Sequence, residues 1–307
     1  MRSNPKNRGS IRQRRPISIK PRRRRKESKV IYYLHIHKAG GSTMCKQALK
    51  QKLSVSFKNN CNVQEDQHCC GMEDSLEAQI RYANDTGFDF VATEKEMYDT
   101  MATDYYDYVV TLRDSATRYV SHWKHVMNIQ DARQKQGKKI LVRNFSAWWE
   151  LQPDNYSTRM ICGFKCLDRS KFQITPQLFQ YTLQRLSLFS HVLFLENMEA
   201  SYTTFATAIG WNTGLKVAHE NKAESNNKNK NDTKTMPEKI NDPFMTALDD
   251  ALYAFARKRY EGNYTNHSDT LLLVKQYANS TDVQDYFRDG RDRNCIDPCC
   301  GTCSKWR

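Results

Sequence analysis

The chain has 307 residues, of which 39% are hydrophobic, so it can form one large folded domain or two small ones. Its formal net charge is +14, but residues 1–29 hold 13 Lys and Arg against one Glu, which leaves the rest of the chain close to neutral. No stretch reaches the ~18 consecutive apolar residues of a membrane helix, and no apolar core of a signal peptide is visible.

Residues 1–29 contain several prolines and almost no apolar side chains, which predicts a disordered polybasic tail. Three roles stay open for this tail: a solvated arm, a segment that contacts anionic lipid or a sorting receptor, and an arm for nucleic acid. Basic patches interleaved with aromatic residues do not recur in the body of the chain, so no nucleic-acid partner is expected. Membrane association would come from this tail or from an anchor outside this sequence.

A strand, a tight loop and a helix are predicted where the apolar run 30–36 leads through LHIHKAGGSTMC into a helix at 42–52. The N-terminus of a helix offers unpaired N–H groups and the positive end of its dipole, so this loop suits an anion. Glycine lets the backbone approach a ligand, lysine adds a charge, and Ser and Thr add hydroxyl donors. A Walker A loop is excluded, because the lysine precedes the glycines. The predicted anion-binding residues are Lys38, Ala39, Gly40, Gly41, Ser42 and Thr43.

The next predicted elements are a Cys-bearing loop at 54–75, a helix at 76–83 and a strand at 88–93. A second strand-to-helix corner follows, where strand 107–112 of DYVVTLRDSATRYVSHW leads into a helix at 114–128. Arg113 stands at the carboxyl end of this strand, and Ser121 lies eight residues on, about two helical turns away. Ligands of open α/β sheets collect at the carboxyl ends of strands, so the two corners suggest one ligand with two anionic groups.

The pair HxxKxGGST and LRD…RYxSxW resembles the two cofactor-binding segments of sulfotransferases that use PAPS, 3′-phosphoadenosine 5′-phosphosulfate. Among carbohydrate sulfotransferases, the motifs are most similar to the heparan sulfate 6-O-sulfotransferase group. The resemblance implies a P-loop-like, three-layer α/β/α fold, a PAPS donor, a glycan or polysaccharide hydroxyl as acceptor, and no required metal. It implies that Lys38 and its loop hold the 5′-phosphosulfate, while Arg113 and Ser121 hold the 3′-phosphate. Arg159, within NYSTRMICG, would contact the cofactor or substrate as part of a segment that closes over the nucleotide.

Transfer to a hydroxyl also needs a general base, and two side chains stand out. Glu94 follows strand 88–93 at the same sheet edge as Lys38 and Arg113, where several sulfotransferases place a catalytic Glu or His. His68, in QEDQHCC, has the better ordinary pKa and would suit the histidine base of the heparan sulfate group. The other histidine alternatives are His35, His37, His122 and His125, of which His37 is placed to orient the loop.

Two more residues of the second motif receive structural interpretations. Arg118 lies five residues after Arg113, so it faces another side of the helix and is expected in a surface or ion-pair role. Trp123 is expected to belong to the core and not to stack on an adenine base.

The rest of the chain continues the alternation of helical and strand patterns. The predicted elements are a polar loop at 130–139, helices near 144–150, 155–161 and 175–188, a strand at 191–195, a helix at 197–209, a mobile polar loop at 219–239 and an amphipathic helix at 243–260. Alternating strands and helices imply an α/β fold with a mainly parallel central sheet and helices on both faces. We therefore expect one domain over 30–290, followed by a Cys-rich segment at 291–307.

Ten cysteines in local clusters indicate disulfides and an oxidising compartment. Cys162 and Cys166 are predicted to form a local disulfide, whereas Cys45 is predicted to be a buried free thiol. The C-terminal CIDPCCGTC favours disulfides over zinc, because it lacks two CxxC pairs. Seven Asn-x-Ser/Thr sequons also indicate a glycoprotein of the Golgi lumen or another secretory compartment. They begin at Asn84, Asn144, Asn155, Asn231, Asn263, Asn266 and Asn279.

Two other classes of function stay open. A P-loop-like kinase is disfavoured by the lack of a Walker lysine and of an obvious acid pair for Mg²⁺, and magnesium-dependent ATP consumption would support it. A non-catalytic glycan-binding protein of the same fold would bind glycan without nucleotide, and the set Lys38, Arg113 and Ser121 counts against it.

Overall fold

A computed structural model describes residues 29–56, 60–62, 75–140, 142, 144–167, 169–214, 243–262 and 266–293. Several predictions concern residues outside this set. They are the tail up to residue 28, the candidate base His68, the polar loop 219–239, the C-terminal cysteines, and the sequons at Asn231 and Asn263.

The centre of the fold is a four-stranded sheet in the order β2-β1-β3-β4, in which every neighbouring pair is parallel. Its strands are β1 (Val30–Leu34), β2 (Phe90–Thr93), β3 (Tyr106–Leu112) and β4 (His191–Phe194). The side chains of β1 are buried throughout, as the near-continuous apolar runs of parallel strands require. The prediction of an α/β fold with a mainly parallel sheet is confirmed, and each strand lies within two residues of its expected bounds.

Helices occupy most of the remaining described chain. They are α1 (Gly41–Lys50), α3 (Leu76–Thr86), α4 (Ser115–Lys135), α5 (Phe145–Glu150), α6 (Tyr156–Cys162), α7 (Phe164–Leu167), α8 (Pro176–Ser187), α9 (Met198–Ala208), α10 (Ala247–Glu261), α11 (His267–Ala278) and α12 (Thr281–Arg293). The predicted loop at 130–139 was wrong in its first half, because α4 runs on through the helix-forming residues before Gln136. Helices α7, α11 and α12 were not predicted from the sequence.

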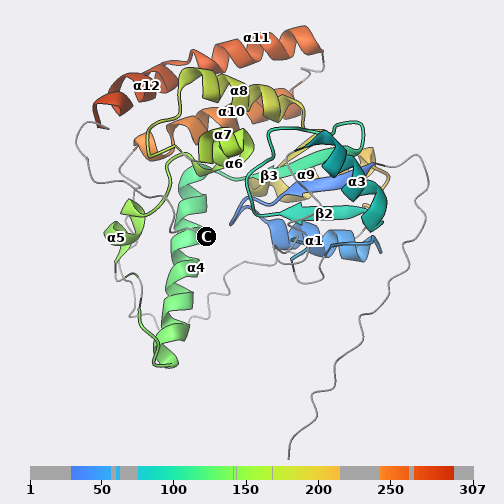
Figure 1. The fold of residues 1–307 in the computed structure, drawn as a ribbon, viewed down its shortest axis with the longest axis horizontal. Coiled ribbons are helices and arrows are strands. Elements are labelled where there is room, and N and C mark those ends of the chain that lie inside the picture. Colours follow the sequence, from blue (N-terminus) through green and yellow to red (C-terminus); the bar gives the residue numbers. More distant parts are fainter. Residues whose placement is uncertain are drawn as a thin grey trace, which may run out of the picture.

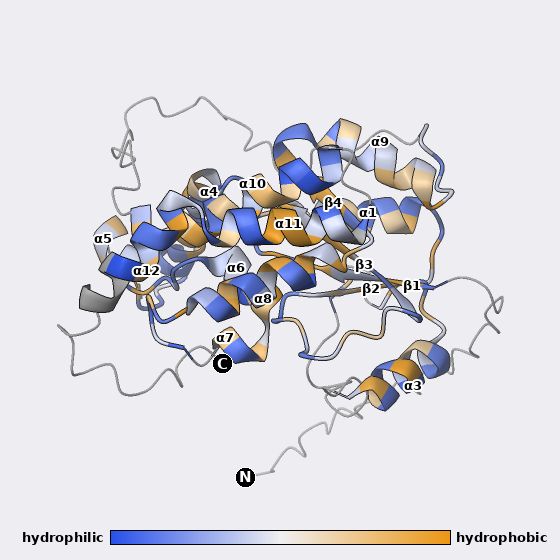
Figure 2. Ribbon diagram, turned by 90° about the horizontal axis from the view of Figure 1, so that it is seen from above, coloured by the Kyte–Doolittle hydropathy of each residue, from blue (hydrophilic) through white to orange (hydrophobic). Residues whose placement is uncertain are grey.

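The two faces of the sheet pack against different helices. One face, which includes Tyr33 and Val109, packs against α1 and α9 through Met44 and Phe205. The other face, which includes Tyr32, packs against α3, α6, α8 and α10. Figure 1 shows α11 and α12 outside α8 and α10, and α4 extending away from the rest with α5 beside it. Figure 2 shows hydrophobic and hydrophilic residues sharing most of these helices, as helices with one buried face require.

The N-termini of α6 and α10 are joined by a buried set of hydrogen bonds. The Asp249 carboxylate accepts from the backbone N–H groups of Ser157 and Thr158, at 3.0 and 2.7 Å. Asn155 Oδ1 accepts in return from the N–H groups of Leu248 and Asp249, at 2.8 and 3.2 Å. Each side chain satisfies donors that a helix start leaves unpaired, so the two helices hold each other in place.

The described part of the chain contains two disulfides. The predicted Cys162–Cys166 pair is confirmed. The prediction of a free thiol at Cys45 was wrong, because Cys45 is bonded to Cys61, 16 residues on. Closing a loop of this length removes unfolded-chain entropy worth about 3 kcal/mol. No described helix is long and apolar enough to cross a membrane.

One sequon is incompatible with the folded structure. Asn155 is fully buried, and its amide nitrogen donates to Asp154 Oδ2 and to the Phe244 carbonyl, at 3.0 and 3.2 Å. We predict that Asn155 carries no glycan when the chain is expressed through the secretory pathway of a eukaryotic host, because a sugar there would break this network. Glycopeptide mass spectrometry would check this, with the exposed sequons at Asn144 and Asn279 as internal controls. Occupancy at Asn155 equal to that at the controls would contradict the prediction.

Candidate functional site

The loop between β1 and α1 is shaped by two left-handed residues. Lys38 has φ 67° and Gly40 has φ 90°, a region in which glycine is favoured. Gly40 is the N-cap of α1, and having no side chain it forms no side-chain cap hydrogen bond with this helix. The N-cap residue therefore leaves the first N–H groups of α1 and the positive end of its dipole without a capping side chain.

A buried histidine lies directly beneath this turn. A Cβ added at Gly41 would overlap Cδ2 and Nε2 of the His35 ring, so only glycine fits there. His35 is 4% exposed, and its Nδ1 lies 3.1 Å from Asn62 Oδ1 and 3.2 Å from Glu94 Oε1. The missing Cβ of Gly41 thus makes room for His35, and the predicted role of Gly41 in binding an anion through its backbone stays a prediction.

The two predicted corners meet through a hydrogen bond. Arg113 Nη1 donates to the carbonyl oxygen of Lys38 at 3.1 Å, although 75 residues separate them. Arg113 Nε donates to Thr117 Oγ1 at 3.2 Å, which fixes the plane of the guanidinium. Burial and the charge of Arg113 lower the pKa of Lys38, and Glu94 opposes this by raising it. Lys38 and Arg113 therefore form one cationic centre, with Glu94 as a nearby acid.

The second corner differs from the first at its helix start. Asp114 caps α4, because its carboxylate accepts from the Thr117 N–H at 2.9 Å. The N–H of Asp114 itself donates to Glu196 Oε1 at 3.0 Å. An anion at this corner would therefore meet the Arg113 guanidinium and not an open helix end. Ser121 is partly buried on α4, and within the described residues its hydroxyl makes no hydrogen bond.

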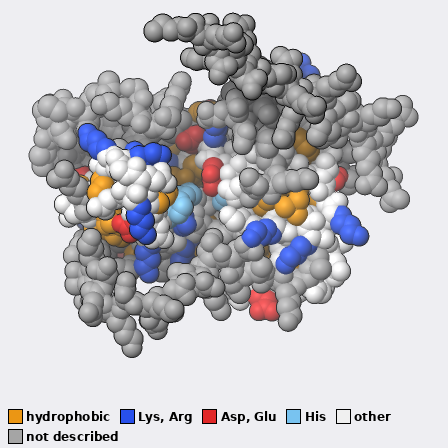
Figure 3. Space-filling view, turned by 90° about the horizontal axis from the view of Figure 1, so that it is seen from below, with side chains coloured by type: hydrophobic (Ala, Val, Ile, Leu, Met, Phe, Trp, Pro, Cys, Tyr) orange, Lys and Arg blue, Asp and Glu red, His pale blue; other side chains and the backbone are white. Residues whose placement is uncertain are grey.

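Three histidines gather beside Lys38. The ring centroid of His37 lies 4.6 Å from that of His122 and 5.6 Å from that of His125. His122 and His125 are three residues apart, so they share a face of α4. Figure 3, a view from below Figure 1, shows histidine side chains near the centre of this surface, between groups of Lys and Arg. Spacing within α4 could have suggested the His122 and His125 pair, but their meeting with His37 is a tertiary contact.

Burial and neighbouring cations keep these histidines neutral at pH 7. Burial, followed by His122 and Lys38, lowers the pKa of His37 to about 3. Burial and the charge of Arg118 lower the pKa of His122 to about 4. The pKa of His125 is lowered chiefly by burial and then by Lys38. Neutral imidazoles can accept as well as donate hydrogen bonds, so this surface can take up a proton when an anion offsets the cations.

Arg118 was predicted to have a surface or ion-pair role, and the prediction of a surface position was wrong. Arg118 is 1% exposed, and its guanidinium carbon lies 4.0 Å from the Tyr119 ring centroid and 4.5 Å from that of Tyr156. Its charge lowers the pKa of the buried Asp249, against the larger effect of burial. Arg118 thus supports the Asp249 cap from between two aromatic rings, where cation–π attraction replaces part of its lost hydration.

Arg159 is also engaged by the protein. Its Nη2 donates to Asp154 Oδ1 at 2.5 Å and to the Ser170 carbonyl at 2.9 Å. Nη1 donates to the carbonyls of Cys166 and Arg169, and Nε donates to that of Asp154. All five donors of the guanidinium are therefore used within the fold, which does not leave Arg159 free to bind the predicted nucleotide.

Aromatic side chains of α5 cover the neighbouring part of α4. The partly buried Trp123 lies 5.6 Å from Phe145 and 5.4 Å from Trp148 between ring centroids. Trp148 in turn lies 5.3 Å from the ring of His122. Trp123 packs against protein rings but is only partly buried, so the prediction that it belongs to the core was wrong.

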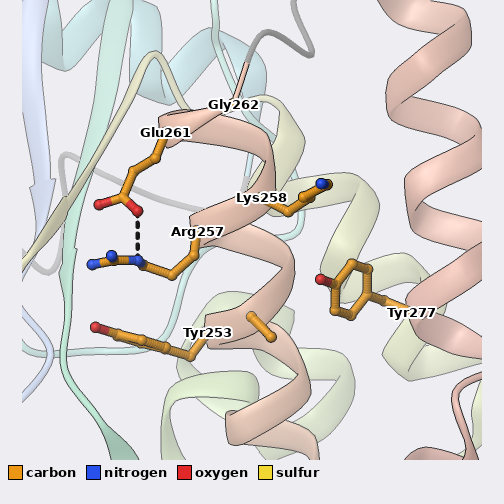
Figure 4. A pocket seen from close by; sticks show the side chains of 7 residues that line it. Tyr253, Arg257, Lys258, Glu261, Gly262 and Tyr277 are labelled. Atoms are coloured by element: carbon orange, nitrogen blue, oxygen red, sulfur yellow. Dashed lines mark ion pairs between the residues drawn. The ribbon is translucent and has the colours of Figure 1, made fainter.

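A shallow pocket of about 610 Å³ lies elsewhere, against α10. Tyr253, Arg257 and Glu261 lie on one side of it, and Lys258 points toward Tyr277 on the other (Figure 4). Arg257 Nε and Glu261 Oε2 are 2.6 Å apart. No residue predicted for the site lines this pocket, and the described residues contain no cluster of His, Cys, Asp and Glu able to hold a metal ion.

Comparisons with protein-family models, with curated proteins and with solved structures found no match for this chain. The interpretation of the site therefore rests on its own residues and on the two motifs.

The histidine pKa values predict how stability depends on pH. Between about pH 4 and 6.5 the unfolded chain binds more protons than the folded one, because the folded pKa values of His37 and His122 lie below the ordinary 6.5. The free energy of unfolding should therefore have its full value above pH 6.5. It should fall on acidification, by up to ~1.4 kcal/mol per pH unit for each histidine.

Urea unfolding between pH 4.5 and 7.5 would measure this slope. The double variant His37→Gln/His122→Gln should have a flatter profile, whereas Lys124→Gln at an exposed position of α4 should keep the wild-type slope. Equal slopes in all three proteins would show that the histidines are not responsible.

Proposed function

We propose that this protein is a PAPS-dependent sulfotransferase of P-loop-like, three-layer α/β/α architecture that acts on a hydroxyl of a glycan or polysaccharide. The observation that carries the proposal is the hydrogen bond from Arg113 to the Lys38 carbonyl, beside the uncapped start of α1. It makes the two motifs one cationic centre, suited to a ligand with anionic groups at two ends. The resemblance of both motifs to PAPS-binding segments identifies the ligand class.

Each predicted site residue would bind a different part of the donor. Lys38 and the N–H groups of Gly41 and Ser42 would hold the phosphosulfate end and neutralise charge on the leaving phosphate. Arg113 and Ser121 would hold the 3′-phosphate. The donor supplies the sulfuryl group: the S–O bond to its 5′-phosphate breaks as the acceptor oxygen bonds to sulfur. The hydroxyl proton goes to a base, and 3′-phosphoadenosine 5′-phosphate leaves.

Glu94 is our first choice for the base. It is exposed, it lies near Lys38, and His35 Nδ1 is 3.2 Å from its Oε1, which orients the carboxylate. His35 itself is a poor base, because its Nε2 side faces Gly41 beneath the loop. His68 remains an alternative, and the α4 pair His122 and His125 is another on account of its contact with His37.

The disulfides and the glycosylation sequons of the chain support a secretory compartment, such as the Golgi lumen. Two buried disulfides favour an oxidising environment. The sequons at Asn84, Asn144, Asn266 and Asn279 stand at exposed positions, so glycosylation there is sterically possible. The polybasic segment 1–29 would mediate any contact with a membrane surface.

Nucleotide binding tests the cationic centre directly. Calorimetry with 3′-phosphoadenosine 5′-phosphate should give a Kd that rises about 10- to 100-fold in Lys38→Ala and in Arg113→Ala, because each variant loses a charge-assisted hydrogen bond. Lys124→Ala, which removes an exposed lysine of α4, should bind like the wild type. Equally weak binding by wild type and Lys38→Ala would refute the proposal.

Transfer itself is measured with radiolabelled PAPS and a panel of glycans, followed by mass spectrometry of the products. Sulfated glycan from the wild type, and none from Lys38→Ala, is the expected result. Magnesium-dependent ATP consumption would identify a kinase instead, and glycan binding without any nucleotide affinity would identify a non-catalytic binding protein.

The identity of the base can be tested separately. Glu94→Gln should lower kcat about 10²- to 10⁴-fold and leave the Kd of the nucleotide unchanged, because a base acts only on the acceptor's proton. His122→Gln and His125→Gln should lower kcat far less. Loss of transfer in His68→Ala, with Glu94→Gln active, would assign the base to His68.

A further inference from the structure

Three consecutive residues, 60–62, lie beside the anion-binding loop, and they are bonded to the loop itself, to α1 and to the histidine beneath the loop. Ser42 Oγ donates to Asn60 Oδ1 at 3.1 Å. Cys61 is disulfide-bonded to Cys45, in the second turn of α1. Asn62 Oδ1 lies 3.1 Å from Nδ1 of the histidine beneath the loop, His35. We call residues 60–62 the strap.

The strap is itself fixed to the edge of the sheet. The Cys61 carbonyl accepts from the Ala92 N–H at 3.0 Å, and Asn62 forms a parallel bridge with Ala92 in β2. The Ser56 hydroxyl donates to the same carbonyl of Cys61. The strap therefore connects β2, which ends one residue before Glu94, to the start of α1.

The disulfide is the one covalent bond in this arrangement. Both sulfur-bearing side chains are buried, with Cys45 1% and Cys61 0% exposed. Without the bond, the strap would be held to the loop by two side-chain hydrogen bonds at partly exposed groups, which contribute little net stability. Ser42 would lose its acceptor and His35 would lose one of its two polar neighbours when the strap moved away.

We propose that the Cys45–Cys61 disulfide is a positioning element of the anion-binding loop: it holds the strap against Ser42 and His35 and so keeps residues 38–43 in their nucleotide-binding conformation. This inference rests on the function proposed above. Cys162–Cys166 has no such role, because it closes a short turn between α6 and α7.

The test compares Cys45→Ser/Cys61→Ser with the matched control Cys162→Ser/Cys166→Ser. Two properties are measured: hydrogen exchange of peptides that cover 35–50, and the Kd for 3′-phosphoadenosine 5′-phosphate. The first variant should exchange at least tenfold faster in this region and bind about tenfold more weakly. The control should match the wild type in both.

Hydrogen exchange needs no ligand, so it separates the two proposals. If the wild type does not bind the nucleotide, the proposed function fails, and exchange at 35–50 still decides whether the disulfide positions the loop. Unchanged exchange in folded Cys45→Ser/Cys61→Ser overturns the inference.

If that variant does not fold, Asn60→Ala/Asn62→Ala decides the matter, because it keeps the disulfide and removes the two side-chain contacts of the strap with Ser42 and His35. Exchange at 35–50 that rises severalfold without a change in α8 supports positioning by the strap. Exchange equal to that of the wild type overturns it.

Discussion

The contact between the His35 ring and Gly41 is the constraint on which the candidate site depends. Because no Cβ fits between them, the turn into α1 packs directly on the imidazole of this buried side chain. The same imidazole contacts Asn62 and Glu94. The predicted anion-binding turn, the disulfide-bonded strap and the candidate base thus all contact a single group.

The site concentrates cations and neutral imidazoles in a partly dehydrated region. Arg113 donates to the Lys38 carbonyl, and burial lowers the pKa of both side chains. The adjacent α4 histidines have lowered pKa values for the same reason. Such an arrangement costs free energy in the absence of an anion, and it becomes favourable when an anion supplies the missing charge.

The strands and most helices follow from the sequence, because the short, mostly apolar runs 30–34 and 106–112 are typical of buried strands in a parallel sheet. The two helix starts are equally local, since glycine or aspartate stands where each begins. The ends of long helices are less predictable. α4 runs through 130–135, where a polar composition suggested a loop, because helix propensity continues after hydrophobic periodicity stops.

The sequence by itself therefore determined the strands, most helices and the two strand-to-helix corners, which depend on neighbouring residues. Only the tertiary structure decided what the long polar side chains and the cysteines do. Arg118 and Arg159 became buried structural groups, and Cys45 found Cys61, because each of these outcomes depends on how the chain folds back on itself and packs. Residue type and spacing carry no such information, whereas packing assigns every buried charge and thiol its partner.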